Sequence, residues 1–149
     1  MVQKIVVSLL FIVCCVMYSQ FQEARGAESN SCAPYRTASG GLPYTKQDAV
    51  ADFGGQWEIQ TIGCEYTLGT VDKKGALTIL FDPAESCKPS PYQDFKMVPS
   101  LGKGSFLVPD KGSLFLIKGP VCVNVSCMLI PCSDEKIIRI GQKMMSRLP

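Results

Sequence analysis

The sequence predicts an all-β, disulfide-stapled domain, and within that class a small antiparallel barrel, a meander of about eight short strands. Three observations lead to this prediction. From Trp57 onward, short runs of β-branched, aromatic and aliphatic residues alternate with turn residues. Almost no helical periodicity is visible. Six cysteines remain once an N-terminal targeting segment is removed. Closure into a barrel removes the unpaired edges of a sheet, and a two-sheet β-sandwich is the alternative.

The first 26 residues have the pattern of a secretory signal peptide. Lys4 precedes an apolar stretch at residues 5–17, and Ala24 and Gly26 supply the small residues at positions −3 and −1 of a cleavage site. The apolar stretch is shorter than the roughly 20 residues that cross a bilayer. We therefore expect cleavage after Gly26 and a secreted, extracellular protein without a membrane anchor.

The cysteines of the mature chain indicate three disulfides. These cysteines are Cys32, Cys64, Cys87, Cys122, Cys127 and Cys132. An even number in a short secreted chain is typical of a disulfide framework, although spacing alone does not choose among the possible pairings. A zinc site is disfavoured because the mature chain has no C-x2-C pair and no histidine. We expect neither a metal nor a cofactor.

The expected domain organisation has three parts: the signal peptide at 1–26, an irregular N-terminal arm at 27–54 and a single β-barrel domain at 55–149. The arm has little periodicity and contains Gly40-Gly41-Leu42-Pro43; one helical turn at 47–53 ends at Gly54-Gly55. The expected strands are residues 57–62, 64–71, 76–81, 95–98, 105–108, 113–118, 121–128 and 137–140. The basic residues after the last strand form a frayed tail.

Turn residues separate these strands. Residues 72–75 form a four-residue loop that ends in glycine, as hairpin loops often do. The segment Lys88-Pro89-Ser90-Pro91 predicts a stiff, extended loop, because proline has no N–H to donate to a strand ladder.

Gly55-Gln56-Trp57, at the start of the first strand, resembles the first-strand motif of the calycin barrels, which include lipocalins, avidins and small bacterial metallopeptidase inhibitors. Residues 66–72, Gly75 and Leu77-Thr78 look like the next two strands of avidins, and the resemblance spans about residues 47–87. It implies a barrel with an apolar interior. Similarity to the inhibitors implies that Cys64 pairs with Cys87. Because Trp57 is the only tryptophan, biotin binding is not expected.

Composition argues against several function classes. A net charge of +2 without a basic run gives little reason to bind nucleic acid. Without histidine the chain cannot form a Ser-His-Asp triad or a Cys-His pair. Most carboxylates fall in turns, and their spacing does not indicate a catalytic pair. We therefore expect no catalytic residues and no enzyme activity.

Two binding functions and a structural role remain. In the first, the barrel carries a small hydrophobic ligand in its interior. The residues expected to line this interior are Trp57, Ile59, Leu77, Ile79, Leu114 and Leu116. In the second, the protein is a secreted protein-binding module (a peptidase inhibitor, effector or toxin), because proline stiffening at 83–91 lowers the entropy lost on binding. An extracellular structural component is the third. Asn124-Val125-Ser126 is an N-glycosylation sequon, with Asn124 facing away from the apolar side of its strand.

Overall fold

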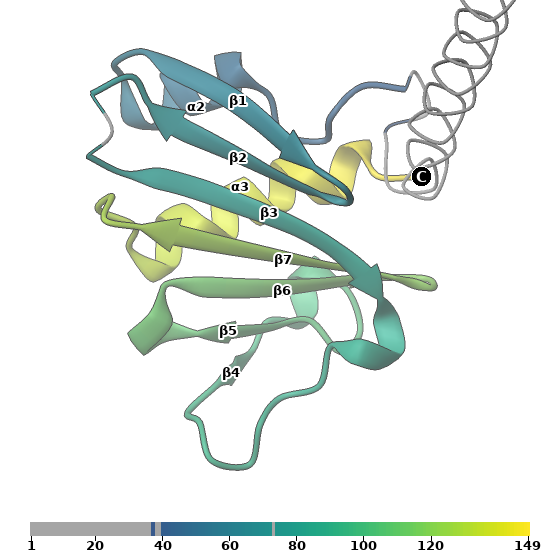
Figure 1. Cartoon of the computed structure of the whole chain (residues 1–149). Helices are drawn as coiled ribbons and strands as arrows, with labels where there is room; N and C mark the ends of the chain where they lie inside the picture. The colour runs from purple at the N-terminus through teal and green to yellow at the C-terminus, as the bar shows by residue number, and fades with distance from the viewer. Residues whose placement is uncertain (1–36, 38–39, 73) are drawn as a thin grey trace, which may run out of the picture. The chain divides into compact units, whose positions relative to one another are not determined.

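A computed structural model describes Thr37, residues 40–72 and residues 74–149 (Figure 1). The predicted signal peptide and Cys32 lie outside the described residues. The compact unit that contains the described residues spans Pro34–Pro149.

Within the described residues, seven antiparallel strands form one sheet. They are β1 (Trp57–Ile62), β2 (Glu65–Thr70), β3 (Ala76–Pro83), β4 (Lys96–Met97), β5 (Phe106–Val108), β6 (Ser113–Lys118) and β7 (Val121–Met128). Their order in the sheet is β1-β2-β3-β7-β6-β5-β4. The mostly-β fold is confirmed. The sheet is not closed into a barrel, because β1 and β4 are its outer strands and do not pair with each other.

The strand order also departs from the expected meander, because β3 pairs with β7 rather than with β4. This pairing runs from Ala76 opposite Met128 to Pro83 opposite Val121 and joins the two longest strands of the sheet. After β3 the chain leaves the sheet through the proline-containing segment and rejoins it at the far edge as β4 (Figure 1). The prediction that this segment lies outside the ladder is confirmed.

The C-terminus forms a helix, α3 (Asp134–Arg147), where a strand at 137–140 and a frayed tail are predicted from sequence. That prediction is wrong. Ser133 caps the helix by accepting a hydrogen bond from the Lys136 N–H. The buried residues recur at helical spacing: Ile137, Ile140, Gly141 and Met144. The Ser133 cap and the helical spacing of the buried residues outweigh the β-branched composition of residues 137–140, on which the strand prediction rests.

A second helix, α2 (Lys46–Phe53), lies within the predicted irregular arm. Thr45 and Asp48 form a capping box at its start, and Gly54 ends it with a positive φ of 73°. Tyr44 and Ala49 are fully buried in the core. Residues before Gly55 therefore contribute to the hydrophobic core. The predicted boundary between arm and domain at Gly55 stays a prediction.

The hydrophobic core lies between the sheet and the helices. Figure 1 shows α3 running behind β2, β3 and β7, with α2 near the start of β1. The Cβ of an alanine at Gly141 would lie 2.7 Å from a Leu114 methyl group and 3.0 Å from one of Leu101. Glycine therefore allows α3 to approach the sheet closely. The other side of the sheet, which neither helix covers, is called the open face below.

The disulfides differ from the pairing implied by the inhibitor resemblance. Cys87 bonds to Cys122, and Cys127 bonds to Cys132. Cys64 is also disulfide-bonded, but Cys87 is not its partner, so the predicted Cys64–Cys87 bond is wrong. The cause is the β3–β7 pairing, which places Cys122 opposite Asp82 and so within reach of the segment that follows β3.

Ion pairs tie α2 to α3. The Lys143 ammonium lies 2.7 Å from Asp52 Oδ1, and Arg147 Nη2 lies 3.0 Å from Asp48 Oδ1. The hydrogen bond from Arg147 holds the pKa of the Asp48 carboxyl well below its usual range. The Tyr44 hydroxyl donates a 2.7 Å hydrogen bond to Asp52 Oδ2, which connects this cluster to the core.

Two buried tyrosines are expected to respond differently to loss of their hydroxyl groups. Tyr44→Phe removes a hydrogen bond to a carboxylate and should lower the free energy of unfolding by about 1.5–3 kcal/mol. The Tyr66 hydroxyl is buried near the Tyr44 backbone, but no hydrogen bond of normal geometry reaches it from the described residues. Tyr66→Phe should therefore leave stability unchanged or raise it. Urea unfolding followed by circular dichroism measures both. Equal destabilisation by the two variants would contradict the assignment.

Candidate binding surface

The open face is organised by cross-strand register. Residues that lie opposite one another on neighbouring antiparallel strands point to the same side of the sheet. One such row crosses all seven strands and consists of Ile62, Glu65, Leu80, Asn124, Phe115, Phe106 and Met97. Its half on β4, β5 and β6 is apolar.

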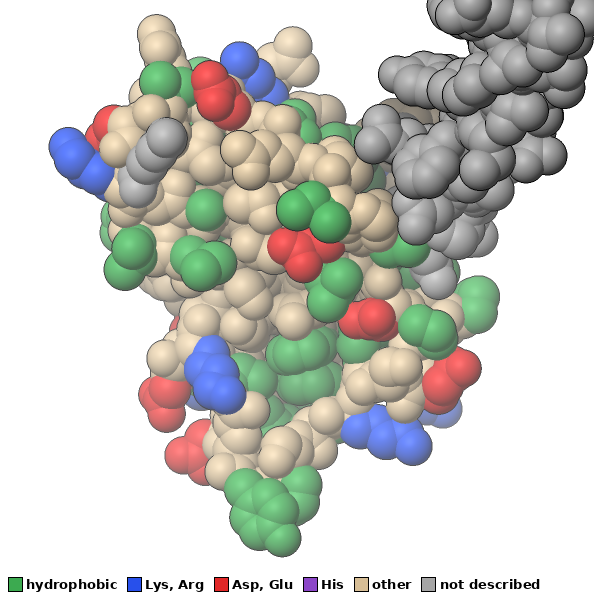
Figure 2. Space-filling view, in the orientation of Figure 1, with side chains coloured by type: hydrophobic (Ala, Val, Ile, Leu, Met, Phe, Trp, Pro, Cys, Tyr) green, Lys and Arg blue, Asp and Glu red, His purple; other side chains and the backbone are tan. Residues whose placement is uncertain are grey.

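The apolar half of this row belongs to an aromatic cluster, defined here as Phe95, Met97, Phe106 and Phe115. Phe106 and Phe115 stack with their ring centroids 4.5 Å apart, and Phe95 meets Phe106 edge-on at 6.0 Å. Phe106 is buried, whereas Phe95 and Met97 are exposed. Figure 2 shows hydrophobic side chains gathered over β5 and β6 and at the tip of the loop before β4. The cluster therefore offers a rigid apolar surface to solvent.

The loop between β3 and β4, residues 84–95, lies beside the aromatic cluster. Its first half is fixed to β7 by the Cys87–Cys122 disulfide. The Tyr92 N–H donates to Ser90 Oγ at 3.3 Å within a turn flanked by proline. Tyr92 itself is 96% exposed. A large ring is thus held out in solvent on a stiffened loop.

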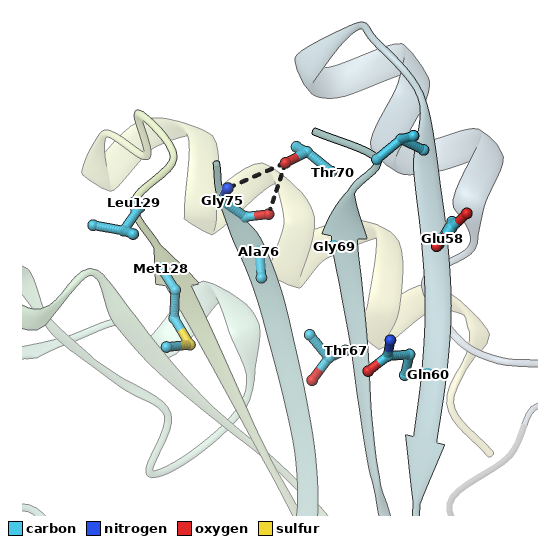
Figure 3. Close-up of a pocket in the computed structure, with 10 residues that line it drawn as sticks. Glu58, Gln60, Thr67, Gly69, Thr70, Gly75, Ala76, Met128 and Leu129 are labelled. Carbon is cyan, nitrogen blue, oxygen red and sulfur yellow. Dashed lines mark hydrogen bonds between the residues drawn. The ribbon is translucent and has the colours of Figure 1, made fainter. Parts of the chain in front are cut away.

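The other half of the open face is more polar and contains a pocket of about 330 Å³ (Figure 3). The pocket is lined by Glu58, Gln60, Thr67, Gly69, Thr70, Val71, Gly75, Ala76, Met128 and Leu129. Two of the lining residues are joined by hydrogen bonds: the Thr70 hydroxyl accepts one from the Gly75 N–H and donates one to the Gly75 carbonyl, both at 3.1 Å. Glu58 supplies the carboxylate of this pocket, and Met128 and Leu129 supply an apolar rim.

A second pocket, of about 460 Å³, lies where α2 ends and β1 begins. Trp57 lines it together with Phe53, Ile130, Pro131 and Lys136. The Lys136 ammonium lies 4.6 Å from the centre of the Phe53 ring, a cation–π contact. The Gly55-Gln56-Trp57 segment therefore forms one wall of a surface pocket.

The residues predicted to line a barrel interior lie mostly in the core. Leu77, Ile79, Leu114 and Leu116 are fully buried in a single hydrophobic cluster with α3, Trp57 is 1% exposed, and Ile59 is exposed. Of the two pockets above, one touches this set, through Trp57. Side chains of α3 fill the space beside the sheet that the barrel model leaves for a ligand.

Asn124 lies near the middle of the open face on β7. As predicted, it faces away from Val123 and Val125, whose side chains are buried in the core. Asn124 is half-buried, and its Oδ1 accepts a 3.2 Å hydrogen bond from Ser126 Oγ, the hydroxyl of the same sequon.

Among the described residues, no group of three or more metal-ligating side chains (histidine, cysteine, aspartate or glutamate) is placed to hold an ion. In the same part of the chain, no helix has the length and apolar character needed to span a membrane.

In the part of the chain that the structure describes, the fold is a disulfide-bonded sheet with α2 and α3 on one face and neither helix on the open face. Comparisons with protein-family models, with curated proteins and with solved structures found no match. The resemblance to calycin barrels stays a prediction.

Proposed function

We propose that this is a secreted, non-enzymatic module that binds an extracellular protein through Tyr92 and the aromatic cluster. The observation that carries the proposal is the 96% exposure of Tyr92 on a loop braced by the Cys87–Cys122 disulfide. Tyrosine is enriched among the residues that dominate protein interfaces. A braced loop also loses little conformational entropy on binding.

The surroundings of Tyr92 support a protein as the partner. Phe95 and Met97 are exposed beside the stacked pair Phe106 and Phe115, so one rigid apolar surface continues from the loop onto the sheet. An interface of this kind combines an apolar centre with a polar rim. The disulfides are compatible with an oxidising, extracellular compartment.

The test is capture of a partner from the native extracellular fluid, followed by a binding titration with the variants. Tyr92→Ala should weaken binding by about thirtyfold or more, because truncating an interface hot spot costs about 2 kcal/mol or more. Leu129→Ala is the matched control, since Leu129 is 90% exposed but lies in the region of the Figure 3 pocket. Equal binding by the wild type and Tyr92→Ala, with both folded, would refute the proposal.

Carriage of a small ligand is the second candidate, and the pocket in Figure 3 favours it. Its volume of about 330 Å³ lies at the lower end of the range for small-molecule sites. An amphipathic ligand would place its apolar part against Met128 and a cationic or hydrogen-bonding group near Glu58. Titration with a hydrophobic fluorophore distinguishes the two candidates, because fluorescence that Met128→Ala reduces and Tyr92→Ala does not would favour the pocket.

A further inference from the structure

The outer edge of β1 has no strand beside it within the described part of the chain. On its inner side β1 pairs with β2, and the Val71 N–H donates to the Gln56 carbonyl at 3.0 Å at the start of this ladder. In an antiparallel ladder, alternate residues direct their N–H and C=O groups to the same side. Counting from Gln56, the groups of Ile59 and Thr61 therefore point outward.

The accessible part of this edge is centred on Gln60. Trp57 is buried, whereas every residue from Glu58 to Ile62 is exposed. The exposed stretch keeps an unbroken register with β2, contains neither lysine nor proline, and carries a single charge, on Glu58. Proteins usually blunt free edges with lysine, proline, bulges or very short strands. The opposite edge fits that rule, because β4 has only two residues, one of them Lys96.

We propose that β1 pairs in an antiparallel manner with β1 of a second copy of this chain, with the twofold axis at Gln60. This register places Gln60 opposite Gln60 of the second copy, Ile59 opposite Thr61, and Glu58 opposite Ile62. It uses all five exposed residues and joins the outward groups of Ile59 and Thr61 in hydrogen-bonded pairs.

Burial and charge disfavour the registers whose axis lies closer to the start of β1. An axis at Ile59 would pair Thr61 with Trp57, which is buried and so cannot present its outward edge. An axis at Glu58 would place two carboxylates directly opposite each other, which is destabilising. With the axis at Gln60, the two Glu58 residues are offset by four positions, or about 13 Å, along the strands. The two Gln60 amides each carry a donor and an acceptor and are therefore self-complementary.

The pairing would also extend the pocket of Figure 3. Glu58 and Gln60 line this pocket from β1. In the proposed dimer, Ile62 of the second copy lies opposite Glu58 and adds apolar surface at the open side of the pocket. The dimer does not depend on the proposed binding at Tyr92, because Tyr92 lies in the loop that leads to β4, the strand at the opposite edge of the sheet from β1.

A cysteine at the axis tests the register directly. Residues opposite each other in a non-hydrogen-bonded pair have Cα atoms about 4.5 Å apart, which is within the range of a disulfide. Gln60→Cys should therefore form a covalent dimer under mild oxidation. Glu58→Cys is the matched control: it lies on the same strand and face, but its Cα atoms would be about 13 Å apart and should not cross-link. Non-reducing electrophoresis measures both.

Sedimentation of the wild-type protein is the second measurement. We expect a concentration-dependent dimer, shifted to the monomer by Gln60→Lys, which opposes two like charges at the axis. Circular dichroism checks that each variant is folded. A wild type that is monomeric at every concentration tested, or a Glu58→Cys variant that cross-links as readily as Gln60→Cys, would overturn the proposal. If β1 paired with a different protein instead, the purified wild type would sediment as a monomer at every concentration, and the proposed dimer would be overturned.

Discussion

Trp57→Ala is expected to lower the free energy of unfolding by about 3–5 kcal/mol, the usual cost of truncating a buried tryptophan. The ring is 1% exposed, and its centroid lies 5.4 Å from that of Phe53 at the end of α2. The indole N–H donates a 2.7 Å hydrogen bond to the Gly54 carbonyl. The substitution therefore removes both the packing and the polar contact that join α2 to β1.

Two measurements check the role of Trp57. Urea unfolding must be followed by circular dichroism, since the variant has no tryptophan. Trp57→Phe is the control: it retains an aromatic ring against Phe53 but cannot donate to Gly54, so it should be destabilised less than the alanine variant. Because the wild type has one tryptophan, blue-shifted, quencher-resistant emission is also expected. Easily quenched emission in the folded protein would contradict the burial described above.

Replacement of Cys87 and Cys122 together by serine is expected to cost roughly 3–4 kcal/mol in the chain-entropy model of disulfide stabilisation. The two cysteines are 35 positions apart, and their bond joins the loop after β3 to the central strand β7. Replacement of Cys127 and Cys132, only five positions apart, should cost less, roughly 2 kcal/mol. Equal urea midpoints for the two double variants would contradict this ranking.

The same pair of variants tests the proposed binding role of the loop. Loss of the Cys87–Cys122 bond frees the loop that presents Tyr92, so partner affinity should fall in that variant. It should change little when Cys127 and Cys132 are replaced. The comparison is made with both variants folded, at a temperature well below the unfolding midpoint of each.

Local sequence signals predicted the strands well, because alternation and turn chemistry act over a few residues. The bounds of β1 and β6 match the expected segments. The pairing of β3 with β7 could not be predicted, because register between distant strands depends on the core they share. For the same reason, the Cys87–Cys122 bond could not be predicted from sequence. This limitation also explains why a closed barrel was expected where the sheet stays open.

The helix α3 could have been predicted. Ser133 followed by Asp134 and Glu135 is a helix start signal, and Ile137, Ile140 and Met144 have helical spacing. The apolar character of the open face at β6 could also have been predicted, because residues 114–117 are all apolar. A strand without polar alternation is apolar on both faces. The exposure of Tyr92 could not be predicted from sequence, since it depends on where the loop lies.

The position of Asn124 on β7 has a consequence for the order of events during synthesis. β7 emerges last among the strands and completes the sheet by entering between β3 and β6. Glycosylation of Asn124 stays a prediction; if it occurs, the glycan would have to be added while the sequon is still extended and accessible, before this final insertion. Slower insertion of β7 would then raise the fraction of glycosylated chains, and the glycan would lie on the open face beside Phe115.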